Sequence, residues 1–328
     1  MYCCTIRMAN SLLTLNNFRL LFTPVIEPNK LLKSLESRAK GLNNYNTQFH
    51  GTKAHWVVEA QNRTPGDPVF VYFHGGGYCL PLLDTHIKFL IQLYKTLNDS
   101  RFSILVVDYS LAPEKPYPTQ LIEAATVYQE LVDKDHARKI ILSGDSAGGN
   151  LAVVLSAHLK HHHPEAPLPE TYVQPFAEVL ISPWIKIFPE LEGSYLENSD
   201  ADILGLGARE WANAYISNDE KLLEVPWVSP LDSKPEFWEG VFPKNTLITC
   251  GENEVMKDDV LRFKQLVKIP RLHYELDGSH NSLFLDRNLK NHALLLEIVH
   301  YIREILGTGP PQSVLAAKES HNAHATKL

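Results

Sequence analysis

The stretch KIILSGDSAGGNLAVVLSAHLK, residues 139–160, decides the fold of this chain of 328 residues. An apolar run typical of a buried strand leads through Gly-Asp-Ser-Ala-Gly into a pattern typical of a helix. Gly144 and Gly148 let the backbone turn tightly without Cβ clashes. We therefore predict a strand, a sharp turn that lifts Ser146 above the strand ends, and a helix from Ala147 whose free N–H groups face the site. A plain tight turn is the alternative.

Short apolar runs alternate with helical patterns along the rest of the chain. The runs are VFVYF (69–73), SILVVDYS (103–110), AEVLIS (177–182), TLITC (246–250) and RLHYEL (271–276). The helical patterns cover 120–134, 147–160, 259–267 and 293–306. Near-continuous apolar strands between helices indicate a mostly parallel sheet covered on both faces, with right-handed crossovers. The predicted fold class is doubly wound α/β.

Two stretches break this alternation. Residues 1–50 have loosely amphipathic helical patterns, and residues 185–238 are rich in aromatic and turn residues. We interpret both as parts of one lid over the carboxyl ends of the strands; the alternative is two unrelated surface segments. The catalytic domain is expected over 51–306, and the tail 307–328 is expected to be disordered.

The composition limits the classes of partner. Apolar residues make up 44% and charged residues 21% of the chain, enough for a large core. The net charge is −7 with no basic stripe, so no nucleic-acid partner is expected. The apolar stretch at 11–26 is interrupted by polar residues and a proline, short of the roughly 20 apolar residues of a membrane span. We expect at most a peripheral membrane contact. The histidines at 161–163 are interpreted as solvated surface, and no metal site is expected.

The motif HGGGY directly follows the VFVYF run. Its glycines leave backbone N–H groups free to bind a developing oxyanion. The predicted donors are Gly75, Gly76 and Gly77, with the N–H of Ala147. A phosphate-binding loop is the rival interpretation, but the Gly-Lys-Ser/Thr of such loops is missing. His74 is expected to hold the loop by hydrogen bonding rather than to act as a base.

A serine nucleophile needs a base and an orienting acid. His280 lies in DGSHNSLF, a glycine-containing loop after the last apolar run. The acid is expected in CGENEVMKDD, where Glu252, Glu254, Asp258 and Asp259 compete. The two aspartates fall at the start of a helix, where capping is their alternative role. Glu254 is left in the centre of the loop and is the predicted acid, with Glu252 next; the order serine, acid, histidine is that of α/β-hydrolases.

These motifs together resemble the hormone-sensitive-lipase-like branch of the α/β-hydrolase superfamily, over roughly residues 50–305. They are HGGG at 74–77, VVDYSLAPE at 106–114, GDSAGG at 144–149 and the loops of Glu254 and His280. Within that branch, ISPW, SYLENSDADIL and PWVSPLDS are similar to the fungal steryl acetyl hydrolases.

The resemblance implies a lid-covered serine esterase that removes acetyl groups from sterol acetates. It also implies a helical lid from the N-terminus and from an insertion after the sixth strand, and anchoring at the endoplasmic reticulum by an N-terminal span. This chain shows no such span, which would favour the cytoplasm instead. It also has Ser110 where arginine is usual, and NEVMKDD where Asp-Pro-Leu is common, with Glu254 at the position of the triad aspartate.

The predicted reaction is ester hydrolysis through an acyl-enzyme on Ser146, without metal or organic cofactor. The expected substrate is a short-chain, acetyl ester of a hydrophobic alcohol, because the insertion is rich in aromatic residues. The candidate substrate-binding residues are Tyr78, Trp184, Trp211 and Tyr215. An arylformamidase-type amidase and a non-catalytic binding protein for small ligands on the same fold are the alternatives. The sequence does not predict the oligomeric state.

Overall fold

The computed structural model describes residues 13–205 and 207–308. Most of the predicted disordered tail, from residue 309 onward, therefore lies outside the described residues. No helix among those described is both long enough and apolar enough to cross a membrane.

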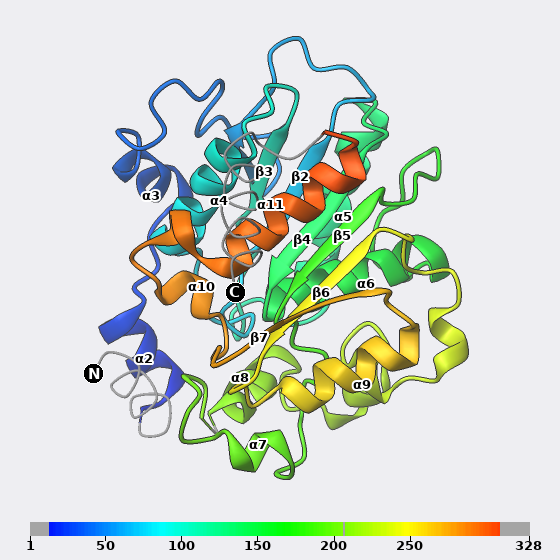
Figure 1. The fold of residues 1–328 in the computed structure, drawn as a ribbon. Coiled ribbons are helices and arrows are strands. Elements are labelled where there is room, and N and C mark those ends of the chain that lie inside the picture. The colour runs from blue at the N-terminus through cyan, green and yellow to red at the C-terminus, as the bar shows by residue number, and fades with distance from the viewer. Residues whose placement is uncertain (1–12, 206, 309–328) are drawn as a thin grey trace, which may run out of the picture.

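A seven-stranded sheet forms the centre of the molecule (Figure 1). Its strand order is β1-β3-β2-β4-β5-β6-β7, with β1 antiparallel to β3 and the other neighbours parallel. The strands are β1 (Ala54–Val58), β2 (Val69–Phe73), β3 (Ser103–Val107), β4 (Ile140–Asp145), β5 (Ala177–Ile181), β6 (Thr246–Gly251) and β7 (Arg271–Glu275). The predicted mostly parallel α/β fold is confirmed. β1 was missing from the predicted strands because it adjoins the N-terminal stretch that was interpreted as helical.

Alternating side chains of the inner strands enter two separate cores, whereas the edge strand β7 is only partly buried. On β2, Val69, Val71 and Phe73 pack in one core, and Phe70 and Tyr72 pack in the other. One core is covered by α5 (Thr119–Asp133), α6 (Ala147–His161) and α9 (Lys257–Val267). The other is covered by α3 (Pro28–Ser34), α4 (Asp84–Leu97), α10 (Ser282–Leu285) and α11 (Ala293–Leu306). Both faces of the sheet are buried, as its apolar strands require.

The insertion lies between β5 and β6. It contains the short helices α7 (Ser194–Glu197) and α8 (Ala208–Tyr215) and three 3-10 turns, η1 (Glu220–Glu224), η2 (Pro230–Asp232) and η3 (Pro235–Trp238). A fourth 3-10 turn, η4 (Leu289–Asn291), precedes α11. The expected position after the sixth strand is wrong for the described chain. The described chain has a single strand, β1, before β2, which makes β5 the fifth strand. The insertion begins after β5.

The N-terminal helix α2 (Leu15–Phe22) contacts the insertion. The backbone N–H of Leu15 donates to Glu210 Oε1 at 2.8 Å, and the Phe18 ring meets Trp211 edge-on with centroids 6.3 Å apart. In Figure 1, α2, α7 and α8 lie at the same end of the molecule. The two stretches that break the strand–helix alternation are thus neighbours in space, as the lid interpretation requires.

One predicted surface group is buried. His161 and His162 are exposed, but His163 is covered by the insertion. Its ring meets Trp227 edge-on, and its Nε2 lies 2.9 Å from the hydroxyl of Tyr117. The prediction of a solvated side chain was wrong at this position because the aromatic residue that covers it comes from a distant part of the chain.

Candidate active site

Ser146 occupies the turn between β4 and α6, with φ of 51° and ψ of −117°. A Cβ atom on Gly144 would lie 2.3 Å from the backbone of Gly148, and a Cβ on Gly148 would lie 2.0 Å from the carbonyl oxygen of Phe73. Only glycine fits at either position, because the turn packs directly against the end of β2. The predicted nucleophile elbow is therefore present in the structure.

His280 pairs with Glu254. The Nδ1 atom of His280, in the loop after β7, lies 3.3 Å from Glu254 Oε2, in the loop after β6, and both side chains are at most 2% exposed. The other carboxylate oxygen accepts from the hydroxyl of Ser182 at 2.5 Å and from the N–H of Gly251 at 2.6 Å. The carboxylate is thus held from the side opposite the imidazole.

The charge of this pair acts on the pKa of His280. Burial alone lowers that pKa, but the hydrogen bond and negative charge of Glu254, helped by Asp202 and Asp145, raise it above its ordinary value of 6.5. His280 Nε2 is buried and has no hydrogen-bond partner within the described part of the chain. One ring nitrogen is therefore oriented by an acid while the other is left for proton transfer.

The other three candidate acids have different partners. Glu252 Oε2 accepts from the N–H of Asp277 at 3.1 Å. Asp258 and Asp259 lie in the first turn of α9, as expected, where Asp258 accepts from Ser194 and Asp259 pairs with Arg262. Among the four, Glu254 is the carboxylate that the structure brings to His280.

Asp145 joins the loops of the site. Its Oδ1 accepts from the N–H of Gly75 at 2.8 Å, and its Oδ2 accepts from the side-chain amide of Asn281 at 2.7 Å. Asp145 precedes Ser146 and Asn281 follows His280, so this second bond brings the nucleophile and histidine loops into contact. Asp145 and Asn281 were missed in the sequence; an acid enclosed between Gly144 and Ser146 was the available signal.

The glycine loop after β2 shows which N–H groups can serve an oxyanion. The N–H of Gly75 is engaged by Asp145, which removes it from the set of free donors. The N–H groups of Gly76, Gly77 and Ala147 have no acceptor among residues 13–205 and 207–308. These three remain the candidate donors.

His74 supports the glycine loop. Its ring stacks on Tyr109 with centroids 4.2 Å apart, and its Nδ1 lies 2.7 Å from the carbonyl oxygen of Gly75. Burial, with a smaller effect of His86, lowers the pKa of His74 to about 3. A neutral, stacked imidazole agrees with the expected supporting role.

The aromatic candidates gather behind the glycine loop. Tyr78 stacks on Tyr215 with centroids 4.0 Å apart, and its hydroxyl donates to Asn150 Oδ1 at 2.6 Å. A Cβ on Gly77 would lie 2.3 Å from the Trp211 ring. Trp184 is buried near the same amide, since its carbonyl accepts from Asn150 Nδ2 at 2.8 Å. Substrate binding by these side chains stays a prediction.

No group of three or more histidine, cysteine or acidic residues in the described chain is arranged to hold a metal ion. Three other aromatic residues of the insertion form a chain of contacts. Phe237 meets both Trp227 and Trp238, and Trp238 packs on Phe263 of α9.

Comparison with known proteins identifies the family. The family model described as steryl acetyl hydrolase matches residues 28–282. The Schizosaccharomyces pombe relative mug81 is 29% identical over 248 residues, which cover 71% of this chain and 64% of that protein. Steryl acetyl hydrolase 1 of Saccharomyces cerevisiae is 27% identical over 202 residues, which cover 58% of this chain and 46% of that protein.

The fold also matches solved structures. A hormone-sensitive lipase from a metagenome library superposes with a TM-score of 0.70 at 22% identity, covering 93% of this chain and 97% of that one. The chain spans about half to two thirds of the length of the two yeast relatives. Because the family match covers most of its residues, this chain belongs to the steryl acetyl hydrolase family, and it has the fold of the hormone-sensitive-lipase-like α/β-hydrolases.

Proposed function

We propose that this protein hydrolyses short-chain, acetyl esters of hydrophobic alcohols through an acyl-enzyme on Ser146. The observation that carries the proposal is the buried Glu254–His280 pair, whose loop is bonded to the nucleophile elbow through Asn281 and Asp145. An elbow serine, a histidine with one free ring nitrogen and an orienting acid are the parts that acyl transfer requires.

The steps follow from these positions. His280 Nε2 takes the proton of Ser146 as Oγ bonds to the ester carbonyl carbon, and Glu254 stabilises the imidazolium. The imidazolium returns the proton to the alkoxide as the C–O bond breaks, releasing the alcohol and leaving the acetyl group on Ser146. A water molecule then loses a proton to His280 as its oxygen bonds to the acyl carbon. The bond between the acyl carbon and Ser146 Oγ breaks, the imidazolium gives its proton to Oγ, and the acetyl group leaves as acetic acid, which ionises to acetate.

The negative charge that develops on the carbonyl oxygen would be bound by the N–H groups of Gly76, Gly77 and Ala147. Removal of one such donor typically costs on the order of 3 kcal/mol of transition-state stabilisation. Ala147 is the first residue of α6, so the helix dipole adds to the same effect.

Sterol acetates are the proposed substrates within this class. The support is the family membership together with the aromatic residues that surround the glycine loop. Ser146 is only 4% exposed, so the proposed nucleophile is covered in this structure. The expected peripheral membrane contact stays a prediction; Leu20 and Leu21 of α2 are 75% and 66% exposed.

A panel of esters and amides assayed with wild type and Ser146→Ala tests the proposal. We expect acetates of bulky apolar alcohols to be the best substrates, and Ser146→Ala to lose about three orders of magnitude in turnover while remaining folded. An organophosphate probe should label Ser146, as peptide mapping would show. Labelling of another serine would contradict the proposed mechanism. A clear preference for long acyl chains or for aryl amides would contradict the proposed substrate class.

A further inference from the structure

A polar side chain recurs at every fourth position of one segment of the insertion. Ser194, Asn198 and Asp202 lie on and just after α7, in the sequence SYLENSDAD. Each of them bonds to the backbone of residues 252–258, the acid loop that carries Glu254. We call residues 194–202 the insertion clamp.

Asn198 holds the loop at the position of the acid itself. Its side-chain amide donates to the carbonyl oxygen of Glu254 at 2.8 Å and to that of Glu252 at 3.1 Å. Both contacts are to main-chain atoms, so they fix the path of the backbone through Glu254 rather than its carboxylate.

Asp202 holds the next peptide group. Its Oδ2 accepts from the N–H of Val255 at 2.7 Å, while its Oδ1 accepts from the N–H of Leu204 at 3.1 Å. Asp202 is 1% exposed, and it is close enough to the catalytic pair for their charges to interact. Burial raises the pKa of Asp202 to about 6, and the charge of His280 opposes this rise.

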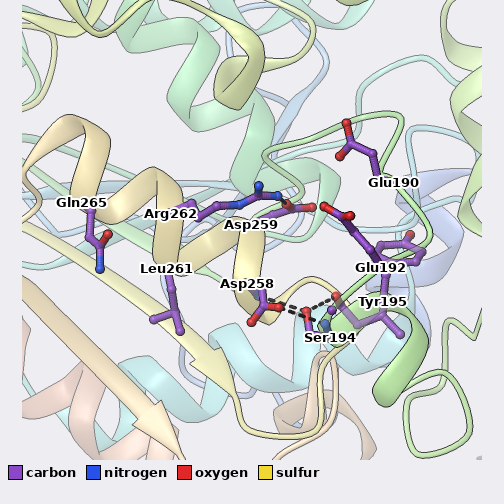
Figure 2. A pocket seen from close by; sticks show the side chains of 11 residues that line it. Glu190, Glu192, Ser194, Tyr195, Asp258, Asp259, Leu261, Arg262 and Gln265 are labelled. Atoms are coloured by element: carbon purple, nitrogen blue, oxygen red, sulfur yellow. Dashed lines mark hydrogen bonds and ion pairs between the residues drawn. The ribbon is translucent and has the colours of Figure 1, made fainter.

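Ser194 completes the clamp at the far end of the loop. Its hydroxyl donates to the carbonyl of Val255 at 2.8 Å and accepts from the N–H of Asp258 at 3.1 Å, and its own N–H donates to the carboxylate of Asp258 at 2.9 Å. Figure 2 shows Ser194 and Asp258 facing each other in the wall of a surface pocket of about 430 Å³. The outer side of the clamp is thus open, and directed hydrogen bonds join it to the acid loop.

The acid loop has little support of its own at these atoms. The N–H of Glu254 reaches the carbonyl of Gly251 at 3.4 Å, and its carbonyl receives the N–H of Lys257 at 3.3 Å, both long bonds. Leaving a buried backbone group without a partner costs about 1–3 kcal/mol. The N–H groups of Glu252 and Asn253 are held by Glu275 and Gly278. Loss of the clamp would therefore mainly let the peptide group that follows Glu254 shift.

The geometry points to a positioning role for Asn198 and Asp202: they hold the acid loop so that the Glu254 carboxylate faces His280. This inference rests on the proposed function, in which Glu254 is the triad acid. The clamp belongs to the insertion that covers the site, so the acid is in place when the insertion is seated against α9.

The test uses Asn198→Ala and the isosteric Asn198→Asp, with Ser199→Ala as the matched control. The Ser199 hydroxyl donates to Leu196 within the same turn and does not contact the acid loop. We expect both Asn198 variants to lose about tenfold or more in kcat while KM changes by less than about threefold, the split expected when a transition-state interaction is weakened. For Asn198→Ala, the acid limb of the pH profile should move to lower pH, because His280 keeps its burial but loses part of the support from Glu254, with Asp202 and Asp145 unchanged. Asn198→Asp adds a negative charge near the pair, so it is compared by kcat and KM alone.

A double-mutant cycle with Glu254→Gln separates positioning from a general structural role. If Asn198 acts through Glu254, Asn198→Ala should have almost no further effect on kcat in the Glu254→Gln background. Independent, additive losses would overturn the inference, as would wild-type kcat in both Asn198 variants with a wild-type pH profile in Asn198→Ala. If the Asn198 variants unfold, Asp202→Asn, which keeps the side-chain volume, replaces them in the cycle, and it too should have almost no further effect on kcat in the Glu254→Gln background. A fully active Glu254→Gln enzyme would instead refute the triad of the proposed function.

Discussion

Asp145 accepts hydrogen bonds from the glycine loop and from the histidine loop, although the proposed chemistry does not pass through it. Replacing it by asparagine turns one acceptor oxygen into a donor, which then faces a donor already present. We expect Asp145→Asn to reduce kcat roughly a hundredfold, since a small misplacement of catalytic groups is costly. Steady-state kinetics of folded protein would show it. Tyr72→Phe, which removes one other donor to the same carboxylate, should stay within about tenfold; equal losses in both variants would contradict a specific bridging role.

Glu254→Gln and Glu252→Gln are a second pair of test and control substitutions. Glu254→Gln removes the charge beside His280 and should reduce turnover a hundredfold or more, with little loss of folding. Glu252→Gln changes a side chain that bonds only toward the histidine loop backbone and should stay within about tenfold. A dead Glu252→Gln enzyme beside an active Glu254→Gln one would transfer the role of the acid.

The pKa of His280 sets the pH dependence. The base must be neutral, so kcat/KM should fall as the pH drops through the pKa of His280, which lies above 6.5. Removing the charge of Glu254 leaves burial dominant and lowers this pKa, so the acid limb of Glu254→Gln should lie at lower pH. The pH profiles of wild type and variant check the direction; a shift to higher pH would exclude the pairing.

Residues inside motifs could be predicted from the sequence, and residues defined by contacts between loops could not. Ser146, His280 and Glu254 follow from a strand–turn–helix pattern and from their order along the chain. Asp202 comes from the insertion, and nothing in its neighbouring sequence indicates that it meets the acid loop. The engagement of the Gly75 N–H is likewise set by tertiary packing.

At the scale of elements, Arg19 of α2 bonds to the backbone near the glycine loop, at Cys79 and Ala112. Arg19 donates from Nε to the carbonyl of Cys79 at 2.6 Å and from a terminal nitrogen to that of Ala112 at 2.8 Å, and it pairs with Glu114 at 2.8 Å. Arg19→Gln should lower the free energy of unfolding by about 2 kcal/mol or more, because two backbone acceptors lose their partner. Denaturant unfolding would measure this.

Lys33→Gln on α3 is the control for Arg19, because it removes the same charge from an exposed helical position. It should change stability by less than about 0.5 kcal/mol. An equal effect of the two substitutions would show that net charge, rather than the bonds of Arg19, is responsible.

The strands β2 to β6 were predictable because each is buried on both faces and therefore lies in a continuous apolar run; the edge strand β7 is only partly buried. α4 was missed, and its buried side includes His86, which interrupts the apolar pattern of a helix that packs on α11. The contact between α2 and α8 could not be predicted residue by residue, because neither the sequence of α2 nor that of α8 indicates which residues of the other helix it meets. It depends on two segments almost 200 residues apart, since Leu15 bonds to Glu210 with a separation of 195 residues.

At the scale of the whole molecule, a buried carboxyl group makes stability depend on pH. Glu178 on β5 is fully buried and accepts from the hydroxyl of Ser156 at 2.6 Å, and burial raises its pKa from 4.5 to about 8. The folded protein then keeps a proton that the unfolded chain has lost. The free energy of unfolding should therefore fall as the pH rises from about 4.5 to about 8.

Glu178→Gln, which is neutral and of the same size, should remove the part of this dependence that Glu178 contributes, while Asp108 and Asp202, whose pKa values burial raises to about 7 and about 6, keep theirs. We expect the variant to gain a few kcal/mol over wild type at high pH and to match it at low pH, where wild type is also neutral. Urea unfolding at several pH values would measure both curves, with exposed Glu236→Gln as control. Parallel curves for wild type and Glu178→Gln would show that another group controls the slope.

The insertion clamp mainly binds backbone atoms of the acid loop, and this affects which substitutions the acid loop can accept during evolution. Three of its bonds end on the carbonyl oxygens of Glu252 and Glu254 and on the N–H of Val255, groups that every amino acid except proline supplies in full. The side chains at Glu252 and Val255 can therefore change without loss of these bonds, whereas Asp258 also binds the clamp through its carboxylate. An acid loop with proline at the position of Val255 could not donate to Asp202, because proline has no N–H. Loops exchanged between related enzymes should therefore work only when the loop supplies the backbone groups that the recipient's clamp binds.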